Sequence, residues 1–337
     1  MNMPVVRPDH ILRIGHAFQE AKVLLSAVEL GLFSALSKGP LDGAALQQRL
    51  GIDPRGAYDF FDALVAMRLL DRDQEGYYAN TAETALYLDQ RQPNYLGSEL
   101  EFLNAHLYGR WDFLTLALKT GKAQSGAGAA GNYPTRYADA DSLAGFAKAM
   151  TAQTLSLAKA LAARFPWRDY QTVVDVGCAE GCLPVELAQV HPHLTGGGFD
   201  LPPLKALFDG YVAEHGCRNR LRFYPGDFFE DSLPAADVLV MGRVLHNWDL
   251  ATKKMLLAKA YGALPPGGAL IVYERLIDDE RRVNVVGLLA SLNMLIMTAG
   301  GFDYTGANCI GWMQEAGFCE VRVAPLAAEQ SMVVGIK

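Results

Sequence analysis

A glycine-bearing turn and four ionisable side chains in the second half of the chain stand directly after short apolar runs. The turn, Gly177–Gly181, follows the β-branched run TVVDV, and Asp200 follows a second run nineteen residues after the turn. In doubly wound folds, an acid about 20 residues past a glycine-rich turn accepts hydrogen bonds from a ribose. Three more ionisable residues, Asp227, His246 and Glu274, follow later runs. The spacing of the turn and Asp200 predicts a nucleoside site.

The composition of the turn narrows the choice of nucleoside. A dinucleotide site needs the spacing GxGxxG, so that pyrophosphate can lie on bare backbone at a helix N-terminus. The chain instead has GCAEG, and the Glu180 carboxylate would repel pyrophosphate. The turn therefore favours a ligand with a cationic centre and no phosphate, which describes S-adenosylmethionine. By itself such a turn is more often an ordinary strand-to-helix connection, and it is Asp200 and the later residues that favour a cofactor site.

A mostly parallel sheet is needed to position these side chains. Beyond the strands before Gly177 and Asp200, strands are predicted in LRFYPGDFF, in ADVLVMGRVLHNW and in PPGGALIVYERLI, with helices between them. The chain then ends in an antiparallel pair, CEVRVAPL and EQSMVVGIK. Ligands of such folds bind at the carboxyl ends of the parallel strands. We therefore expect the turn and the four ionisable residues to converge on one edge of the sheet.

The first hundred residues predict a separate, mainly helical module. Apolar residues recur at helical spacing, Gly51 ends one helix, Pro54 begins the next, and LDRDQEGYYANT alternates around a glycine as a hairpin does. Helices followed by such a hairpin form a winged helix, which can read DNA. Residues 1–100, however, carry 9 Lys and Arg against 13 Asp and Glu. Since DNA binding requires clustered cations, we expect no nucleic-acid partner.

The helical module is instead expected to form a homodimer and to wall a pocket. Its apolar stripe offers more surface than one small module is expected to bury, and large apolar patches usually mark interfaces. The stripe consists of Val23, Leu24, Val28, Leu32 and Leu36, joined by Phe60 and Phe61.

Residues 101–165 are expected to form a helical linker between the two parts of the chain. The segment is rich in aromatic and sulfur side chains, of which Trp111, Phe146 and Met150 are candidates for an aromatic substrate pocket. Its Gly/Ala-rich stretch Ser125–Tyr133 is expected to be a lid or a connector. The predicted division is thus 1–100 for dimerisation, 101–165 for the linker and pocket wall, and 166–337 for the cofactor domain.

Composition and charge indicate a globular enzyme of the cytoplasm. The 337 residues are 50% hydrophobic and carry a net charge of −7, which argues against nucleic-acid and anionic membrane partners. The five cysteines form no CxxC pair, as expected for free thiols in a reducing compartment. The N-terminal residues do not resemble a signal peptide, and no run approaches 18 apolar residues.

Four motifs in order resemble those of the small-molecule O-methyltransferases of the caffeate and acetylserotonin type, including bacterial relatives in natural-product biosynthesis. VVDVGCAEG resembles the family's DVGGGxG, and GGFDLP resembles its FDLP. GDFFEDSLPAADVLVMGRVLHNWD resembles GDFF…LP.AD…VLHDW.D, and LPPGGALIVYERLID resembles the strand after PGG. The resemblance covers essentially the whole chain. It implies a Rossmann-like class I methyltransferase domain, with a seven-stranded, mostly parallel sheet whose last strand is antiparallel, and S-adenosylmethionine as cofactor without a metal.

The resemblance also implies roles for individual residues. His246 corresponds to the catalytic base, and Glu274 to an acid that orients it. The residues implied to bind the cofactor are Gly177, Asp200, Leu201, Gly226, Asp227, Phe228, Gly242 and Arg243. Those expected to line the substrate pocket are Trp111, Phe146, Met150, Asn293, Met294, Met297 and Asn308.

Two departures from the family pattern concern the base. Asn247 stands where an aspartate usually follows the histidine. Counted back from AGF, Asn308 stands where the family often has a second glutamate beside the base. His246 is therefore expected to have at most one acidic partner, Glu274.

The expected reaction is methyl transfer to a hydroxyl, expected to be phenolic, of an aromatic small molecule in secondary metabolism. A neutral histidine can accept the phenol proton near pH 7, since its unperturbed pKa is about 6.5. The sequence has no HxH or HExxH motif, so no metal is expected. Two alternatives stay open. The fold and cofactor could support C-methylation or a non-methylating hydroxylation, decarboxylation or rearrangement, or the chain could be a winged-helix regulator that senses S-adenosylmethionine.

Overall fold

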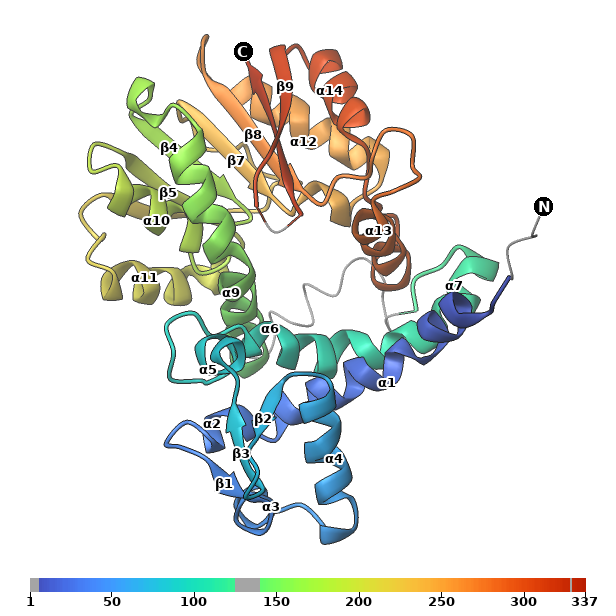
Figure 1. Ribbon diagram of the computed structural model, residues 1–337. Helices are drawn as coiled ribbons and strands as arrows, with labels where there is room; N and C mark the ends of the chain where they lie inside the picture. The colour runs from blue at the N-terminus through green and yellow to red at the C-terminus, as the bar shows by residue number, and fades with distance from the viewer. Residues whose placement is uncertain (1–5, 125–139, 328) are drawn as a thin grey trace, which may run out of the picture. The chain divides into compact units, whose positions relative to one another are not determined.

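The computed structural model describes residues 6–124, 140–327 and 329–337. The chain divides into two compact units, residues 1–109 and 110–337 (Figure 1). The predicted lid or connector Ser125–Tyr133 lies outside the described residues.

The first unit consists of helices around a small antiparallel sheet. Its sheet has the order β1 (Leu41–Asp42), β3 (Tyr77–Asn80), β2 (Leu70–Arg72), so the hairpin around Gly76 is confirmed and a short third strand joins it. Gly51, at φ 65°, ends α3, and Pro54 is the first residue of α4, both as predicted. The helices of this unit are α1 (Asp9–Glu29), α2 (Leu32–Ala35), α3 (Gly43–Leu50), α4 (Pro54–Ala66), α5 (Ala82–Tyr87), α6 (Gly97–Phe102) and the π-helix η1 (Leu103–Leu107).

The apolar stripe that was expected at an interface is mostly the core of this unit. Gly31, at φ 67°, separates α1 from α2, so the stripe does not run along one helix. Val28, Leu32 and Phe61 are at most 3% exposed and pack together with Leu36. The interface prediction for these side chains is wrong, because a second helix and the sheet cover them. The exposed apolar side chains of α1 lie nearer its N-terminus: Ile11, Leu12, Ile14 and Phe18 are 52–73% exposed.

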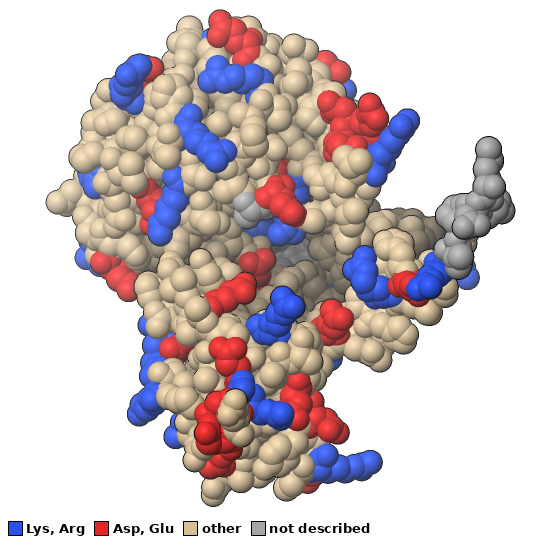
Figure 2. Space-filling model, in the orientation of Figure 1, with Lys and Arg blue, Asp and Glu red and all other residues tan. Residues whose placement is uncertain are grey.

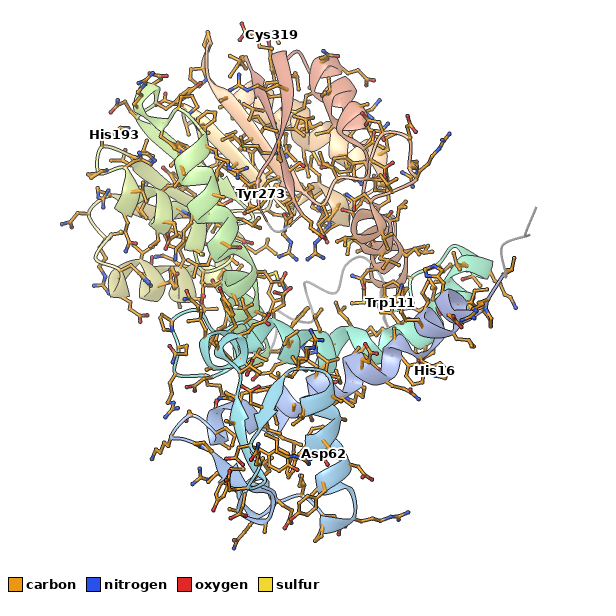
Figure 3. All side chains as sticks on the ribbon, in the orientation of Figure 1. His16, Asp62, Trp111, His193, Tyr273 and Cys319 are labelled. Atoms are coloured by element: carbon orange, nitrogen blue, oxygen red, sulfur yellow. The ribbon has the colours of Figure 1, made fainter. Side chains whose placement is uncertain are left out.

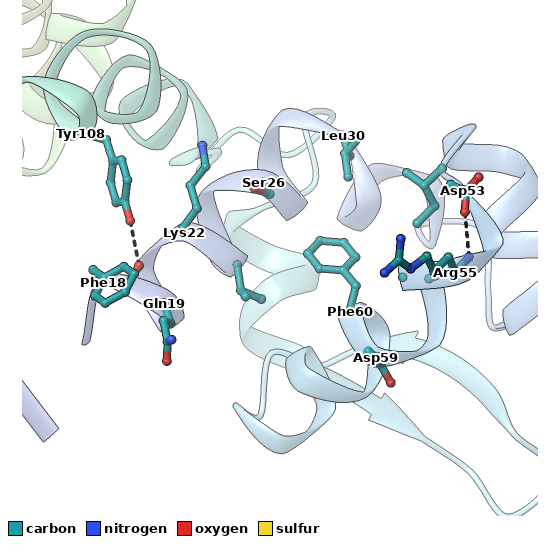
Figure 4. A pocket seen from close by; sticks show the side chains of 14 residues that line it. Phe18, Gln19, Lys22, Ser26, Leu30, Asp53, Arg55, Asp59, Phe60 and Tyr108 are labelled. Carbon is teal, nitrogen blue, oxygen red and sulfur yellow. Dashed lines mark hydrogen bonds between the residues drawn. The ribbon is translucent and has the colours of Figure 1, made fainter. Parts of the chain in front are cut away.

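A groove of about 1120 Å³ lies in the first unit beside α1 and α4 (Figure 4). Phe18, Val23 and Phe60 give it apolar walls, and Lys22 and Arg55 add charge. The Tyr108 hydroxyl closes one end by donating to the Phe18 carbonyl oxygen at 2.8 Å. Among the described residues that line the groove, none belongs to the predicted catalytic or cofactor set.

The second unit contains the predicted seven-stranded sheet. Its order is β6-β5-β4-β7-β8-β10-β9; β6, β5, β4, β7 and β8 run parallel, and β10 is antiparallel to both β8 and β9. The strands are β4 (Thr172–Val176), β5 (Thr195–Asp200), β6 (Leu221–Pro225), β7 (Val238–Gly242), β8 (Ala269–Glu274), β9 (Cys319–Pro325) and β10 (Ser331–Ile336). The predicted fold class is confirmed.

Helices cover both faces of this sheet, so its strands are apolar on both sides (Figure 1). In β8, Leu270 and Val272 pack into one core with α12 and α14, while Ile271 and Tyr273 pack into another with α9 and α10. The helices are α7 (Leu114–Thr120), α9 (Ala140–Arg164), α10 (Cys182–Val190), α11 (Lys205–Glu214), α12 (Leu250–Ala263), α13 (Val285–Met297) and α14 (Gly306–Glu315). Short 3₁₀ turns are η2 (Tyr108–Phe113), η3 (Trp167–Asp169), η4 (Pro202–Leu204) and η5 (Leu245–Asn247).

The strand order fixes where a ligand can bind. From β4 the chain continues to β5 on one side, and it later crosses to β7 on the other. In open α/β sheets, such a reversal leaves a crevice at the carboxyl ends of the two strands. Gly177 follows β4 and Arg243 follows β7, so both flank this crevice.

Charges of both signs are interspersed over the surface. On the face drawn in Figure 2, lysine and arginine side chains alternate with aspartate and glutamate and do not gather into one broad basic area. Among the described helices, none combines the length and the apolar character that a membrane span requires.

Candidate active site

Gly177 brings backbone close to the crevice. Its φ is 81°, which favours glycine, and its N–H donates to the Phe199 carbonyl oxygen at 2.8 Å. A Cβ at this position would lie 2.8 Å from Cγ2 of Val244. Only glycine therefore fits without displacing the residue that leads into the His246 turn.

Asp200 ends β5, and its carboxylate is held by backbone. It accepts hydrogen bonds from the N–H groups of Ala179 at 2.9 Å and Leu201 at 2.8 Å. Burial raises the pKa of Asp200 to about 6, although these two bonds act in the opposite direction. Since a carboxylate offers about four acceptor positions, two bonds leave capacity for ribose hydroxyls.

The loop after β6 is braced from α12. β6 ends at Pro225, two residues before the predicted end at Asp227. The Asp227 carboxylate accepts from the Phe229 N–H at 2.9 Å, which folds the loop back on itself. Lys259 then donates to three carbonyl oxygens of the loop, those of Phe228, Phe229 and Asp231, at 2.7–3.0 Å. Gly226 joins the loop to β5, because its N–H donates to the Asp200 carbonyl oxygen at 3.0 Å.

Gly242 and Arg243 turn the chain at the end of β7. A Cβ on Gly242 would lie 1.9 Å from Cζ of Tyr273, a buried ring labelled in Figure 3, so this position requires glycine. Arg243 has a φ of 56°, a left-handed conformation that is uncommon for arginine and costs backbone strain. Its N–H donates to the Tyr273 carbonyl oxygen at 3.0 Å, and its own carbonyl accepts from Asn247 at 3.1 Å. The strained turn places His246 three residues later.

His246 is held by two buried carboxylates. Its Nδ1 lies 3.4 Å from Oδ1 of Asp303 and 3.5 Å from Oε2 of Glu274. Glu274 also accepts from the His246 backbone N–H at 3.2 Å, so it fixes both the turn and the ring. The histidine side chain is 13% exposed, whereas those of Glu274 and Asp303 are 1% and 0% exposed. With Nδ1 facing the acids, Nε2 is the nitrogen available to an acceptor.

The two carboxylates determine the protonation of the cluster. Burial lowers the pKa of His246, but Glu274 and Asp303 outweigh it, so the pKa is raised. Burial raises the pKa of Glu274 to about 7, and Asp303 adds to that, while His246 and Arg243 oppose it. His246 and Glu274 therefore influence each other's protonation, and the acids stabilise the imidazolium that forms when His246 takes up a proton.

The prediction of a single acidic partner for His246 is wrong, because Asp303 is a second one. The position counted as the second acid, Asn308, instead lies exposed in the first turn of α14. There it forms a capping box with Thr305, donating its N–H to Oγ1 at 3.1 Å and accepting from the Thr305 N–H at 3.2 Å. The predicted substrate-pocket role of Asn308 stays a prediction.

The remaining predicted pocket residues lie on η2, α9 and α13. Trp111 (labelled in Figure 3), Phe146, Met150, Asn293 and Met297 are half-buried, and Met294 is buried. α13 packs against the η5 turn that carries His246, and the Gln124 N–H after α7 donates to the Ile296 carbonyl oxygen at 2.8 Å. The structure thus brings α13 to the base. A substrate role for the residues on η2 and α9 stays a prediction.

The histidine and its two acids could also hold a metal ion. Among the described residues, the ligand atoms of His246, Glu274 and Asp303 lie within 4.8 Å of one another. The Lys253 ammonium, however, is near enough to both carboxylates for them to stabilise its charged form. A fixed cation opposes a divalent ion at the same carboxylates, so we assign the acids to the imidazole.

The fold and site define a class I methyltransferase that uses S-adenosylmethionine. The sequence of residues 111–319 matches the family model of the O-methyltransferase domain. Residues 12–90 match the family model of the O-methyltransferase dimerisation domain. The chain belongs to the O-methyltransferase family, which confirms the resemblance of its motifs.

Similar proteins span the whole chain. The tetracenomycin polyketide synthesis 8-O-methyl transferase TcmO of Streptomyces glaucescens is 40% identical, over 98% of this chain and 97% of its own. The N,N-dimethyltransferase OxyT of Streptomyces rimosus is 37% identical, over 94% of this chain and 92% of its own. The crystal structure of human N-acetylserotonin methyltransferase in complex with S-adenosylmethionine has a TM-score of 0.92 at 26% identity, covering 100% of this chain and 99% of that one.

Proposed function

We propose that this enzyme methylates a phenolic hydroxyl of an aromatic natural product, with His246 as general base. The observation that carries the proposal is the His246 imidazole at the ligand-facing edge of the sheet, held through Nδ1 by Glu274 and Asp303. The similarity to a polyketide 8-O-methyl transferase supports an aromatic hydroxyl as the acceptor.

The residues of the crevice fit the cofactor. Gly177 and Gly242 would approach the cofactor with backbone alone; both positions also require glycine for packing, since a Cβ would meet Val244 or Tyr273 within 2.8 Å. Asp200 would accept from the ribose hydroxyls, and the adjacent Leu201 would lie beside the cofactor. Asp227 and Phe228, which follow Gly226, would bracket the adenine. Arg243 would add a contact from the other side of the crevice. When bound, S-adenosylmethionine supplies a methyl group on a positively charged sulfur.

The chain's own residues orient the acceptor and move its proton. Holding two reactants in line can lower the barrier by about 7–11 kcal/mol. His246 would accept the phenol proton at Nε2, which adds about 10²–10⁴-fold in rate. Glu274 and Asp303 keep the ring in place and stabilise the imidazolium until the proton leaves to solvent. Asn293, Met294 and Met297 of α13 would contact the aromatic acceptor beside the base.

A second candidate acceptor is an amine. The 37% identity to an N,N-dimethyltransferase supports it. A protonated amine must also lose a proton before it can attack, so the same base would serve. Carbon methylation and non-methylating reactions would use the same crevice. The position of the methyl label in the product, or its absence, distinguishes O-, N- and C-methylation from a non-methylating reaction.

We further propose a cytoplasmic homodimer with a three-part chain: a winged-helix-like dimerisation domain in residues 1–100, a substrate-pocket wall in 101–165 and the cofactor domain in 166–337. The match to the O-methyltransferase dimerisation domain over residues 12–90 supports the dimer. The exposed apolar residues of α1 offer a surface for it.

The test is His246→Ala with methyl-labelled S-adenosylmethionine and a panel of polyketide phenols and amines. Turnover should fall by about 10²–10⁴-fold, while affinity for S-adenosylhomocysteine by calorimetry stays unchanged. Wild-type activity should not change in EDTA. A methyl label found on carbon or nitrogen would show that the acceptor is not a hydroxyl. Near wild-type turnover of His246→Ala would show that His246 is not the general base.

A further inference from the structure

Lys253 is a lysine of α12 whose exposed fraction is 0%. Its ammonium donates to the Trp248 carbonyl oxygen. The same nitrogen lies 3.4 Å from the centroid of the Phe302 ring and 5.6 Å from that of Tyr304. Burying an ammonium is costly unless charges and hydrogen bonds compensate it, so its position needs a reason beyond helix packing.

The groups around Lys253 belong to the segments that hold the base. Trp248 directly follows the η5 turn of His246, and Phe302 and Tyr304 are the two neighbours of Asp303 in the chain. A single ammonium therefore connects the turn that carries the imidazole to the segment that carries its second acid.

The charges that face Lys253 come from three elements. They are Glu274 at the end of β8, Asp303 before α14, and Asp249 at the N-terminus of α12 itself. Burial lowers the pKa of Lys253 to about 8, and these three carboxylates oppose that effect. Tyr304 and Cys309, which also face Glu274, stay neutral because burial raises the pKa of each.

The balance of charge at the base depends on this cation. Two buried carboxylates face His246, and Arg243 opposes them by lowering the pKa of the imidazole. Lys253 interacts instead with the two carboxylates themselves. Without Lys253, the two carboxylates would hold the proton on the His246 imidazole to higher pH. A base that keeps its proton cannot take one from the acceptor.

We propose that Lys253 is a positioning residue for the general base, whose buried ammonium ties the His246 turn to the Asp303 segment and offsets the two carboxylates so that the imidazole is neutral at working pH. The proposal rests on the proposed role of His246. It assigns Lys253 no contact with cofactor or substrate.

The test compares pH profiles of kcat for the wild type, Lys253→Met and Lys253→Arg. In Lys253→Met, the acidic limb of the profile should move up by about one pH unit, so turnover below the midpoint falls by up to about tenfold. Lys253→Arg keeps the charge, and its midpoint should match the wild type. Lys253→Gln, which keeps a donor for the Trp248 carbonyl oxygen, replaces the methionine variant if that one does not fold.

The neighbouring Lys254 provides a matched control. Its side chain is 42% exposed and pairs with Glu315 at 2.6 Å at the surface, so Lys254→Met should leave the profile in place. Unchanged affinity for S-adenosylhomocysteine shows that a variant is folded. A neutral variant at position 253 with lower kcat but an unshifted midpoint would overturn the proposal and leave Lys253 a packing role. The His246→Ala enzyme in the same assay separates the two ideas, since its activity alone decides the general base.

Discussion

At the scale of single residues, the site depends on how a few buried charges are balanced. Burial lowers the pKa of His246, but Glu274 and Asp303 outweigh it and raise the pKa. The Lys253 ammonium interacts with the same two carboxylates. Because only the neutral imidazole accepts a proton, turnover in the wild type should rise with pH through the titration of the cluster. Removing the negative charge of Asp303 and removing the positive charge of Lys253 should therefore move the pH midpoint of turnover in opposite directions.

The variant Asp303→Asn tests the acid side of this balance. It removes one negative neighbour, so the imidazolium becomes less stable and the acidic limb of the kcat profile should move down by about one pH unit. The plateau should fall as well, because the amide holds Nδ1 less firmly. The pH profile of kcat is measured for Asp303→Asn and for a control variant, Asp279→Asn. Asp279 is an exposed acid that accepts from the Ala307 N–H at 2.9 Å. An upward or absent shift in Asp303→Asn alone would show that this acid does not act on His246.

At the scale of elements, the strands and their ends were predictable, and the connections between them were not. Strands buried on both faces read as hydrophobic segments closed by turns, which predicts β4 and β8. Gly177 directly follows β4, Glu274 is the last residue of β8, and Asp200 is the last residue of the glycine-rich β5. Asp303 was missed because it lies in an irregular segment with no periodicity, and its place depends on Thr305 beginning α14.

Two further errors have physical causes of the same kind. Lys253 gave no signal in the sequence, since a lysine within a helix is usually solvated. The stripe of the first unit was counted along one helix, whereas Gly31 breaks it and turns Leu32 and Leu36 into core residues. In both cases the burial of the side chain is determined by tertiary packing, which the spacing of residues along the sequence does not show.

The loop after β6 carries a prediction at this scale. Lys259 of α12 donates to the carbonyl oxygens of Phe228, Phe229 and Asp231, and so holds the segment proposed to bracket adenine. Lys259→Met should weaken binding of S-adenosylhomocysteine by about tenfold or more, in line with about 1.5–3 kcal/mol for hydrogen bonds to a charged group. Calorimetry measures the affinity, with Lys254→Met, on a half-exposed lysine of the same helix, as control. Equal affinity in both variants would mean that the loop keeps its shape without this brace.

At the scale of the whole molecule, the first unit leaves apolar side chains exposed that could form a homodimer contact. Its own core uses most of the apolar stripe, but Ile11, Ile14 and Phe18 on α1 remain 58–73% exposed. Phe18 also lines the groove beside α4, next to Val23 and Phe60. Exposed apolar side chains that adjoin an apolar groove are typical of interfaces, so we expect a second copy of the chain to cover this surface.

A single charge on that surface should separate the copies. Phe18→Glu, on a side chain that is 59% exposed, should shift the mass measured by light scattering from a dimer toward the monomer mass of 36.6 kDa at micromolar concentration. The matched control is Val190→Glu, on a side chain of similar exposure, 53%, at the end of α10 in the second unit. Because Phe18 contributes little to the core of its own unit, the melting temperature of the separated monomer reports what the partner adds to stability. A wild-type protein that is monomeric in this measurement would contradict the dimer. A Phe18→Glu protein that stays dimeric would show that the dimer contact lies elsewhere.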